Sequence, residues 1–281
     1  MSTETQTVDP VERAERFLAL HQGPEPLLLA NAWDAGSARL LVSLGFKAVA
    51  STSSGFAATM GKLDGAVCRT EAMTHSAVLV KAAGAVPVSA DLENCFSPDP
   101  SDVRTTILEA VSTGLAGFSI EDYSGSPDDP IYDQKLAVER VATAVSVAHR
   151  GPAHLVVTAR AENHIHGRND LADTIARLQA YQEAGADVLF APGLTALADI
   201  RSVVTSVDRP VNVLALPGGP SVAELAEAGV RRVSVGGAFA FAAYGALIEA
   251  ARELLDEGTY GYWDRAGVGR KAVRETFPRA D

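Results

Sequence analysis

The sequence predicts a (β/α)₈ barrel, an α/β TIM-barrel fold in which eight parallel strands alternate with helices around a closed sheet. One observation is a sequence pattern in which a helical stretch ends in glycine and is followed by an apolar run of residues that favour strands. It recurs at residues 44–50, 113–120, 184–190 and 228–235. Glycine suits the left-handed position that ends a helix, and a continuous apolar run suits a strand buried on both faces. A second observation is that eight such runs alternate with helical patterns. The third is a length of 281 residues, which fits one barrel. An open, doubly wound sheet is the alternative, because periodicity does not show closure.

The elements follow in a regular order. The predicted strands cover residues 27–32, 47–51, 86–90, 117–121, 154–159, 187–191, 211–215 and 232–236. The predicted helices cover residues 35–44, 69–83, 101–113, 137–149, 170–184, 197–206 and 222–228, and a last helix lies near 238–257. No linker or abrupt change in composition interrupts them, so residues 1–281 are expected to form a single domain. Residues 1–20 are expected to be a peripheral N-terminal segment and residues 258–281 a C-terminal tail. Gly261, Gly267 and Gly269 predict that this tail is loop-like until about Arg270.

Composition excludes several classes of protein. A hydrophobic fraction of 47% is too high for a disordered chain. The 24 Lys and Arg residues against 35 Asp and Glu give a net charge of −11, without a dense basic run, so nucleic acid and anionic membranes are not expected partners. No apolar run is long enough to span a bilayer, and residues 1–10 do not have the pattern of a signal peptide. Cys68 and Cys95 are too few for a disulfide framework, which predicts a reducing, cytoplasmic location.

Acidic residues follow three neighbouring strands, at the end where barrels carry their chemistry. Asp91 and Glu93 follow the third strand, Glu121 ends the fourth, and Asp64 lies in the loop after the second. Asp91 and Glu93 are two residues apart, so an extended chain points both the same way. A ring of carboxylates without His or Cys suits a hard cation, and Mg²⁺ fits best, with Mn²⁺ also suitable. The alternative is that these residues only cap the helices that follow.

The second and fifth strands end in groups that suit an anion. Arg160 ends the fifth strand, and its guanidinium can bind a substrate carboxylate or phosphate. A structural ion pair with Glu121 or Glu162 is the other interpretation, and both can be true together. The run Ser51-Thr52-Ser53-Ser54-Gly55 ends the second strand and offers hydroxyl and backbone donors, although such turns are common.

Other features are less specific. Gly218-Gly219 and Gly236-Gly237 follow the seventh and eighth strands, where barrels often bind phosphate, but glycine also serves tight turns. His164 and His166 lack a third metal ligand and are expected to face solvent. Cys95 lies close to the carboxylates without an evident base, so it is interpreted as a bystander.

In this order, these residues resemble the isocitrate lyase/phosphoenolpyruvate mutase superfamily. The resemblance runs from about Leu28 to Glu257. It is carried by Asn31–Arg39, Ser51–Asp64, Ala90–Glu93, Gly117–Asp122, Thr158–Glu162 and Arg177–Asp187. It implies a barrel, commonly tetrameric with a final helix exchanged between subunits, that binds Mg²⁺ and a small 2-oxo acid or its enolate.

The resemblance also implies roles for single residues. Asp91 matches the carboxylate next to the metal, and Glu93 and Glu121 match those that hold metal-bound water. Asp64 matches an acidic residue beside the metal and the reacting centre. Arg160 matches the substrate-binding arginine, and the run of Ser51, Thr52 and Ser53 matches the loop around the substrate carboxylate. Asp64, Glu121 and Arg160 are therefore the predicted catalytic residues.

Three departures concern the reaction itself. The lyases carry a Lys-Lys/Arg-Cys-Gly-His motif after the fourth strand, where this chain has residues 122–133 without Cys, Lys or His. The Lys-Thr-Asn-Ser gate of the mutase is also absent. Ala191-Pro192-Gly193 stands where the lyases have a Glu after the sixth strand.

The resulting prediction is a Mg²⁺-dependent lyase or decarboxylase, a homo-oligomer that acts through an enolate on a small 2-oxo or 2-hydroxy dicarboxylate. Decarboxylation needs least from the missing motif. A retro-aldol cleavage would need a new base, for which Tyr123, Tyr132 and His164 are candidates. Chemistry on a P–C bond is one alternative. A barrel that binds a 2-oxo acid without turnover is the other.

Overall fold

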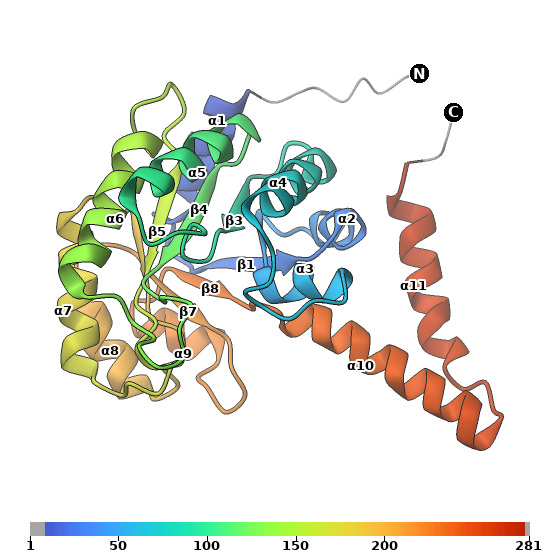
Figure 1. The fold of residues 1–281 in the computed structure, drawn as a ribbon. Coiled ribbons are helices and arrows are strands. Elements are labelled where there is room, and N and C mark those ends of the chain that lie inside the picture. Colours follow the sequence, from blue (N-terminus) through green and yellow to red (C-terminus); the bar gives the residue numbers. More distant parts are fainter. Residues whose placement is uncertain (1–8, 279–281) are drawn as a thin grey trace.

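The computed structural model describes residues 9–278 and contains the predicted closed barrel (Figure 1). All eight strands are parallel and pair in sequence order, and β8 closes the barrel against β1. The strands are β1 (Leu27–Ala32), β2 (Ala48–Ser51), β3 (Val88–Asp91), β4 (Gly117–Glu121), β5 (Val156–Arg160), β6 (Val188–Phe190), β7 (Val211–Leu214) and β8 (Arg232–Ser234). Closure excludes the open-sheet alternative.

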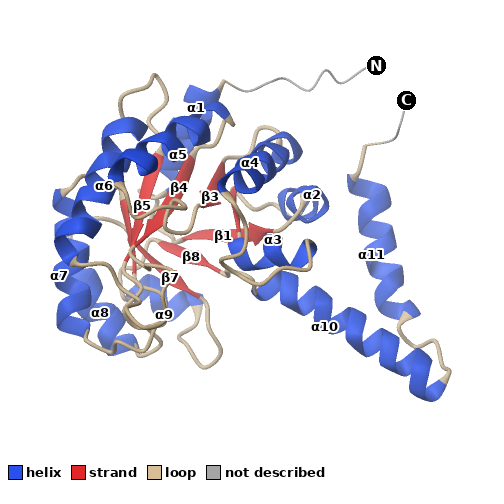
Figure 2. Ribbon diagram, viewed as in Figure 1, coloured by secondary structure: helices blue, strands red, loops and turns tan. Residues whose placement is uncertain are grey.

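Most of the helices lie around the outside of the barrel (Figure 2). The helices in chain order are α1 (Pro10–Leu20), α2 (Ala35–Ser43), α3 (Ser53–Thr59), α4 (Arg69–Ala83), α5 (Pro100–Ser112), α6 (Gln134–Ala148), α7 (Leu171–Glu183), α8 (Leu197–Thr205), α9 (Val222–Glu227), α10 (Ala238–Arg252), a π-helical turn (Glu253–Glu257) and α11 (Trp263–Thr276). Gly45, Gly114, Gly185 and Gly229 follow helices with φ between 82° and 101°, as the recurring pattern predicts.

Side chains alternate between two environments along each strand. In β5, Val157 and Ala159 face outward into the main core between sheet and helices, whereas Val156 belongs to a separate apolar cluster inside the barrel. That inner cluster gathers residues near the start of the strands. Further along the strands the interior becomes polar. Arg160 follows the inward-facing Val156 by four positions and ends β5, so its side chain lies inside the barrel at the carboxyl end.

The prediction of a peripheral N-terminal segment is wrong for the part within the described residues. Residues 10–20 form α1, and its Phe17 is fully buried in the inner cluster against Leu29 and Val156. Gly117 makes room for this ring, because a Cβ at that position would lie 2.9 Å from Phe17 Cε1. Helix α1 therefore closes the amino end of the barrel and leaves the other end open. Residues 1–8 of the predicted segment lie outside the described residues.

Two further expectations about secondary structure are wrong. The tail is not loop-like up to Arg270, because α11 runs through Gly267 and Gly269. Part of the Ser51–Asp64 loop is also helical, because Thr52 Oγ1 accepts the Gly55 N–H at 3.3 Å and caps α3.

Helix α10 projects away from the barrel and α11 turns back towards α2, so that the two helices form an arm (Figure 1). Its apolar side chains are exposed, among them Phe241, Leu247, Leu255 and Trp263. The arm thus presents exposed apolar surface, although α11 also contacts α2, where Thr276 Oγ1 donates to Ser43 Oγ at 3.3 Å. Within residues 9–278, no helix is long and apolar enough to cross a membrane.

Candidate active site

A cavity of about 240 Å³ opens at the carboxyl end of the barrel. Among its lining residues are the predicted Ser51, Thr52, Ser53, Asp64, Asp91 and Arg160. Glu93 and Glu121 line a neighbouring cavity that shares Asp64. The fold therefore gathers all the predicted site residues at one end of the barrel, around two adjoining spaces.

Asp91, the last residue of β3, links three of these segments. One carboxylate oxygen accepts the Ser53 N–H at 3.2 Å, and the other accepts the Ser119 hydroxyl at 3.4 Å. Its own N–H donates to Ser51 Oγ at 2.7 Å. Asp91 Oδ1 also lies 3.1 Å from Arg160 Nη1. Hydrogen bonds at Ser51 and Ser53 thus fix the hydroxyl run to Asp91, the candidate metal ligand.

Arg160, the last residue of β5, lies among three carboxylates. Its Nη1 is 3.1 Å from Asp91 and 3.1 Å from Glu121, and its Nη2 is 2.9 Å from Glu162. Burial alone lowers the pKa of Arg160, but the three carboxylates outweigh it and raise that pKa. The predicted structural ion pairs therefore exist, and Arg160 also lines the cavity, where it can meet an anion.

The remaining carboxylates crowd one another. Burial, followed by the charges of Asp91 and Asp64, raises the pKa of Glu93 to about 8. Burial also raises the pKa of Glu121 well above its usual value, against the opposing effect of Arg160. The pKa of Asp64 is raised by burial as well, although a Ser53 hydrogen bond opposes this. Like charges held together at partial burial cost free energy, which a cation relieves.

This donor set fits a hard divalent cation. It consists of carboxylate and hydroxyl oxygens, and one arginine does not balance four acidic groups. Within the described residues, Asp91, Glu93 and Glu121 do not bring one oxygen each within 4.8 Å of one another. A set that holds the ion partly through water agrees with this spacing, because Mg²⁺ keeps several of its waters.

The loop after β3 has an unusual backbone. Glu93, Cys95 and Phe96 have φ values of 50°, 56° and 64°, in a region that side chains with a Cβ rarely adopt. The tightly turned loop keeps Glu93 beside Asp91, whose Oδ1 accepts the Glu93 N–H at 3.4 Å. Strain of this kind concentrates at functional sites.

The segment that replaces the lyase motif, residues 122–133, begins with an aspartate that has a structural role. Asp122 is buried and accepts hydrogen bonds from the Tyr181 hydroxyl at 2.6 Å and the Glu162 N–H at 2.8 Å. Tyr123 then pairs with Ile131 in an isolated bridge, stacks on His166 and lines the cavity of Glu93 and Glu121. This loop therefore places a tyrosine side chain, and no cysteine, in the wall of the cavity that Glu93 and Glu121 line.

The other candidate bases are placed less favourably. Tyr132 lies under the Arg140 guanidinium, and burial raises its pKa. The expectation that His164 and His166 face solvent is wrong, since both are half-buried. His166 Nε2 lies 3.5 Å from Glu162, and His164 Nε2 is buried without a hydrogen-bond partner. Burial raises the pKa of Cys95 to about 12, so this thiol is not a nucleophile at neutral pH.

Sequence reasoning missed the polar floor of the cavity. Asn31 accepts the N–H groups of Val235 and Gly236 at 3.1 and 2.9 Å, which joins β1 to the turn after β8. Arg232 is buried with neutral partners, Asn212 and Thr158, and burial lowers its pKa to about 9. The signal was present as polar residues at alternate, inward positions of the strands.

The two glycine pairs lie in different places. Gly236 and Gly237 line the cavity, whereas Gly218 and Gly219 are not among its lining residues. A Cβ at Gly237 would lie 2.6 Å from Ser54 Oγ, so the hydroxyl run and the start of α10 meet only because this residue is glycine.

Comparison with known proteins places this geometry in a family. Residues 17–255 match the phosphoenolpyruvate phosphomutase family. An uncharacterized protein of Mycobacterium tuberculosis is 33% identical over 245 residues, covering 85% of this chain and 89% of the relative. The oxaloacetate decarboxylase of Rhodopseudomonas palustris (strain BisB18) is 27% identical over 213 residues, 74% of this chain and 72% of that enzyme.

Solved structures agree. A protein from Burkholderia cenocepacia J2315 is 49% identical, with a TM-score of 0.91, covering 94% of this chain and 95% of that one. A 2,3-dimethylmalate lyase is 27% identical, with a TM-score of 0.80 and 89% of each chain covered. The family match covers most of the barrel. The chain therefore belongs to the phosphoenolpyruvate phosphomutase family and is an enzyme of the isocitrate lyase/phosphoenolpyruvate mutase superfamily of lyases and mutases.

Proposed function

We propose that this enzyme is a Mg²⁺-dependent lyase of the decarboxylase type, which acts through an enolate on a small 2-oxo or 2-hydroxy dicarboxylate. Mn²⁺ is the alternative ion. The observation that carries the proposal is Arg160, paired with Asp91 and Glu121 at the wall of a small polar cavity. In that arrangement the carboxylates can hold a cation, and the guanidinium of Arg160 can bind an anionic substrate.

Different residues would bind the metal ion and the substrate. Asp91 would bind the ion directly, and Glu93 and Glu121 would hold its waters. When bound, the ion would polarise the 2-oxo group and stabilise enolate charge. Arg160 and the donors of Ser51, Thr52 and Ser53 would orient the substrate carboxylate, so that part of the barrier is removed by positioning. The positive charge of Arg232 at the cavity floor also favours an anion over a neutral ligand.

The missing thiol favours decarboxylation over retro-aldol cleavage. Departure of CO₂ leaves an enolate and requires no general base to begin, whereas cleavage of a 2-hydroxy acid requires a group that removes the hydroxyl proton. Asp64 and Tyr123 are the groups beside the carboxylates that could exchange a proton. The oxaloacetate decarboxylase among the relatives supports this preference.

P–C bond chemistry remains a second candidate, because Gly236 and Gly237 line the cavity next to the start of α10, where backbone N–H groups suit a phosphoryl oxygen. Binding of a 2-oxo acid without turnover is the third candidate. The prediction of a reducing, cytoplasmic location remains a prediction.

One assay separates these candidates. We expect the enzyme with Mg²⁺ to release pyruvate from oxaloacetate, methylisocitrate or dimethylmalate, and to release no phosphate from phosphonopyruvate. Phosphate release from phosphonopyruvate would favour the second candidate, and oxalate binding without turnover the third. Asp91→Ala protein is the matched control, because it corrects for the decarboxylation of oxaloacetate that free Mg²⁺ causes. Equal turnover by both proteins would refute the assignment of Asp91.

We further propose a homo-oligomer, a dimer or tetramer, in which the arm of α10 and α11 packs on a neighbouring subunit. The arm exposes 62% of Leu247 and 83% of Leu255, which a monomer would leave in water. We expect Leu247→Glu to shift sedimentation towards smaller species. Leu44→Glu is the control, because Leu44 is 77% exposed but lies outside the arm. A wild-type monomer at micromolar concentration would contradict the proposal.

A further inference from the structure

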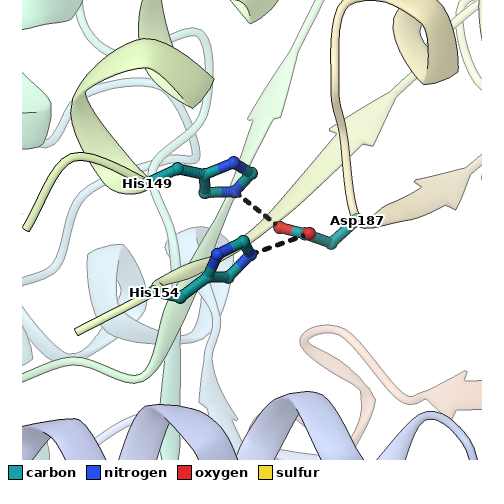
Figure 3. Close-up of side chains that lie close together, drawn as sticks. All are labelled: His149, His154 and Asp187. Atoms are coloured by element: carbon teal, nitrogen blue, oxygen red, sulfur yellow. Dashed lines mark hydrogen bonds and ion pairs between the residues drawn. The ribbon is translucent and has the colours of Figure 1, made fainter. Parts of the chain in front are cut away.

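A cluster of His149, His154 and Asp187 lies at the amino end of the barrel, away from the cavity. His149 follows α6, His154 precedes β5, and Asp187 precedes β6, so all three stand where strands begin. Asp91 and Arg160 stand where strands end. Figure 3 shows both imidazole rings directed at the one carboxylate.

The distances bring three possible ligand atoms together. His149 Nε2 lies 3.0 Å from Asp187 Oδ2, and His154 Nε2 lies 3.0 Å from Asp187 Oδ1. One ligand atom from each residue lies within 4.8 Å of the others, and no other such group of three occurs in residues 9–278. Ligands of a tetrahedral Zn²⁺ at bond lengths near 2.1 Å are about 3.4 Å apart, so little movement is needed.

Both the carboxylate and the rings are held in place. Asp187 Oδ2 also accepts the Val157 N–H at 2.8 Å, which anchors the carboxylate to β5. The two rings are stacked with centroids 3.7 Å apart and planes 20° apart, so their Nε2 atoms present the same edge. The short turn of residues 150–153 keeps them together. Such supporting hydrogen bonds orient ligands in metal sites.

The exposure of the cluster leaves room for a further ligand. The side chains of His149 and His154 are 24% and 40% exposed, whereas that of Asp187 is 9% exposed. A cation bound there can therefore complete its coordination with water. Two imidazoles and one carboxylate suit Zn²⁺, whereas Mg²⁺ prefers oxygen ligands.

We propose that His149, His154 and Asp187 form a Zn²⁺ site, separate from the catalytic carboxylates, that ties the end of α6 to the starts of β5 and β6. Each histidine would bind through Nε2 and keep its proton on Nδ1. The alternative is a purely hydrogen-bonded cluster, in which both Nε2–H groups donate to Asp187. The same coordinates suit both, and metal binding distinguishes them.

The test is a Zn²⁺ titration of the metal-stripped, full-length protein in excess Mg²⁺, added to compete with Zn²⁺ for the oxygen-rich cluster at the other end. We expect one Zn²⁺ per chain, bound at least tenfold more weakly by His154→Gln and by Asp187→Asn, and a rise in Tm on Zn²⁺ addition that both variants lose. His154 is well exposed, so its substitution should not prevent folding.

Asp91→Ala is the matched control. It removes a carboxylate from the opposite end of the barrel and should leave this Zn²⁺ affinity unchanged. Absence of Zn²⁺ binding by the wild type, or equal binding by His154→Gln, would overturn the proposal in favour of the hydrogen-bonded cluster. Loss of binding in Asp91→Ala alone would assign the ion to the catalytic end and would likewise overturn it.

Discussion

Arg160→Gln is expected to abolish turnover and to destabilise the fold. The substitution removes the cation from Asp91, Glu121 and Glu162, all three of which are within 3.1 Å of its guanidinium. Breaking a buried ion pair by removal of one partner costs about 3–5 kcal/mol, because the remaining charge is left without compensation. Loss of the predicted substrate contact should add a decrease in kcat/KM of at least about 100-fold.

Urea unfolding and kcat/KM on the substrate found by the assay above measure the two effects separately. Arg168→Gln is the matched control, because its ion pair with Asp129 is exposed and should contribute less than about 1 kcal/mol. Arg160→Lys keeps the charge without the planar fork, so it should recover stability better than activity. If Arg160→Gln retained wild-type kcat/KM, Arg160 would have only the structural role.

The positions of Asp91 and Arg160 could be predicted because the chemistry of a barrel follows from its strand ends. The glycine that ends four of the helices helped to fix the order of the strands, and the last residues of barrel strands lie at the end that carries the chemistry. Arg160 appeared in the sequence as a charge at the end of an apolar run. Its three simultaneous partners did not, because they come from β3, β4 and the segment after β5.

The missed elements depend on contacts that no local pattern contains. Helix α1 buries Phe17 in a gap left by Gly117, and these two residues are 100 positions apart. Helix α11 contains two glycines and buries no residue, so neither composition nor periodicity favoured it. His149 and Asp187 meet only because β5 and β6 are neighbours in the sheet.

The carboxylate cluster predicts a stability that depends on pH and on the metal. Without a cation, Glu93 has a folded-state pKa of about 8, against 4.5 as its ordinary value. Its folded form therefore holds a proton more tightly than its unfolded form. That contribution is complete below pH 4.5 and is lost as the pH rises through 8, by up to about 5 kcal/mol. We expect the Tm of the metal-free enzyme to fall between pH 5 and pH 8.

Mg²⁺ should cancel much of this loss, because it favours the ionised carboxylates that high pH produces. The increase in Tm on Mg²⁺ addition should thus be larger at pH 8 than at pH 5. Glu93→Gln should weaken the pH dependence of the metal-free protein, since an amide does not titrate. Glu224→Gln is the control, because Ser221 hydrogen bonds lower the pKa of Glu224 and keep it ionised throughout this range. A Mg²⁺ effect that is equal at both pH values would place the ion away from these carboxylates.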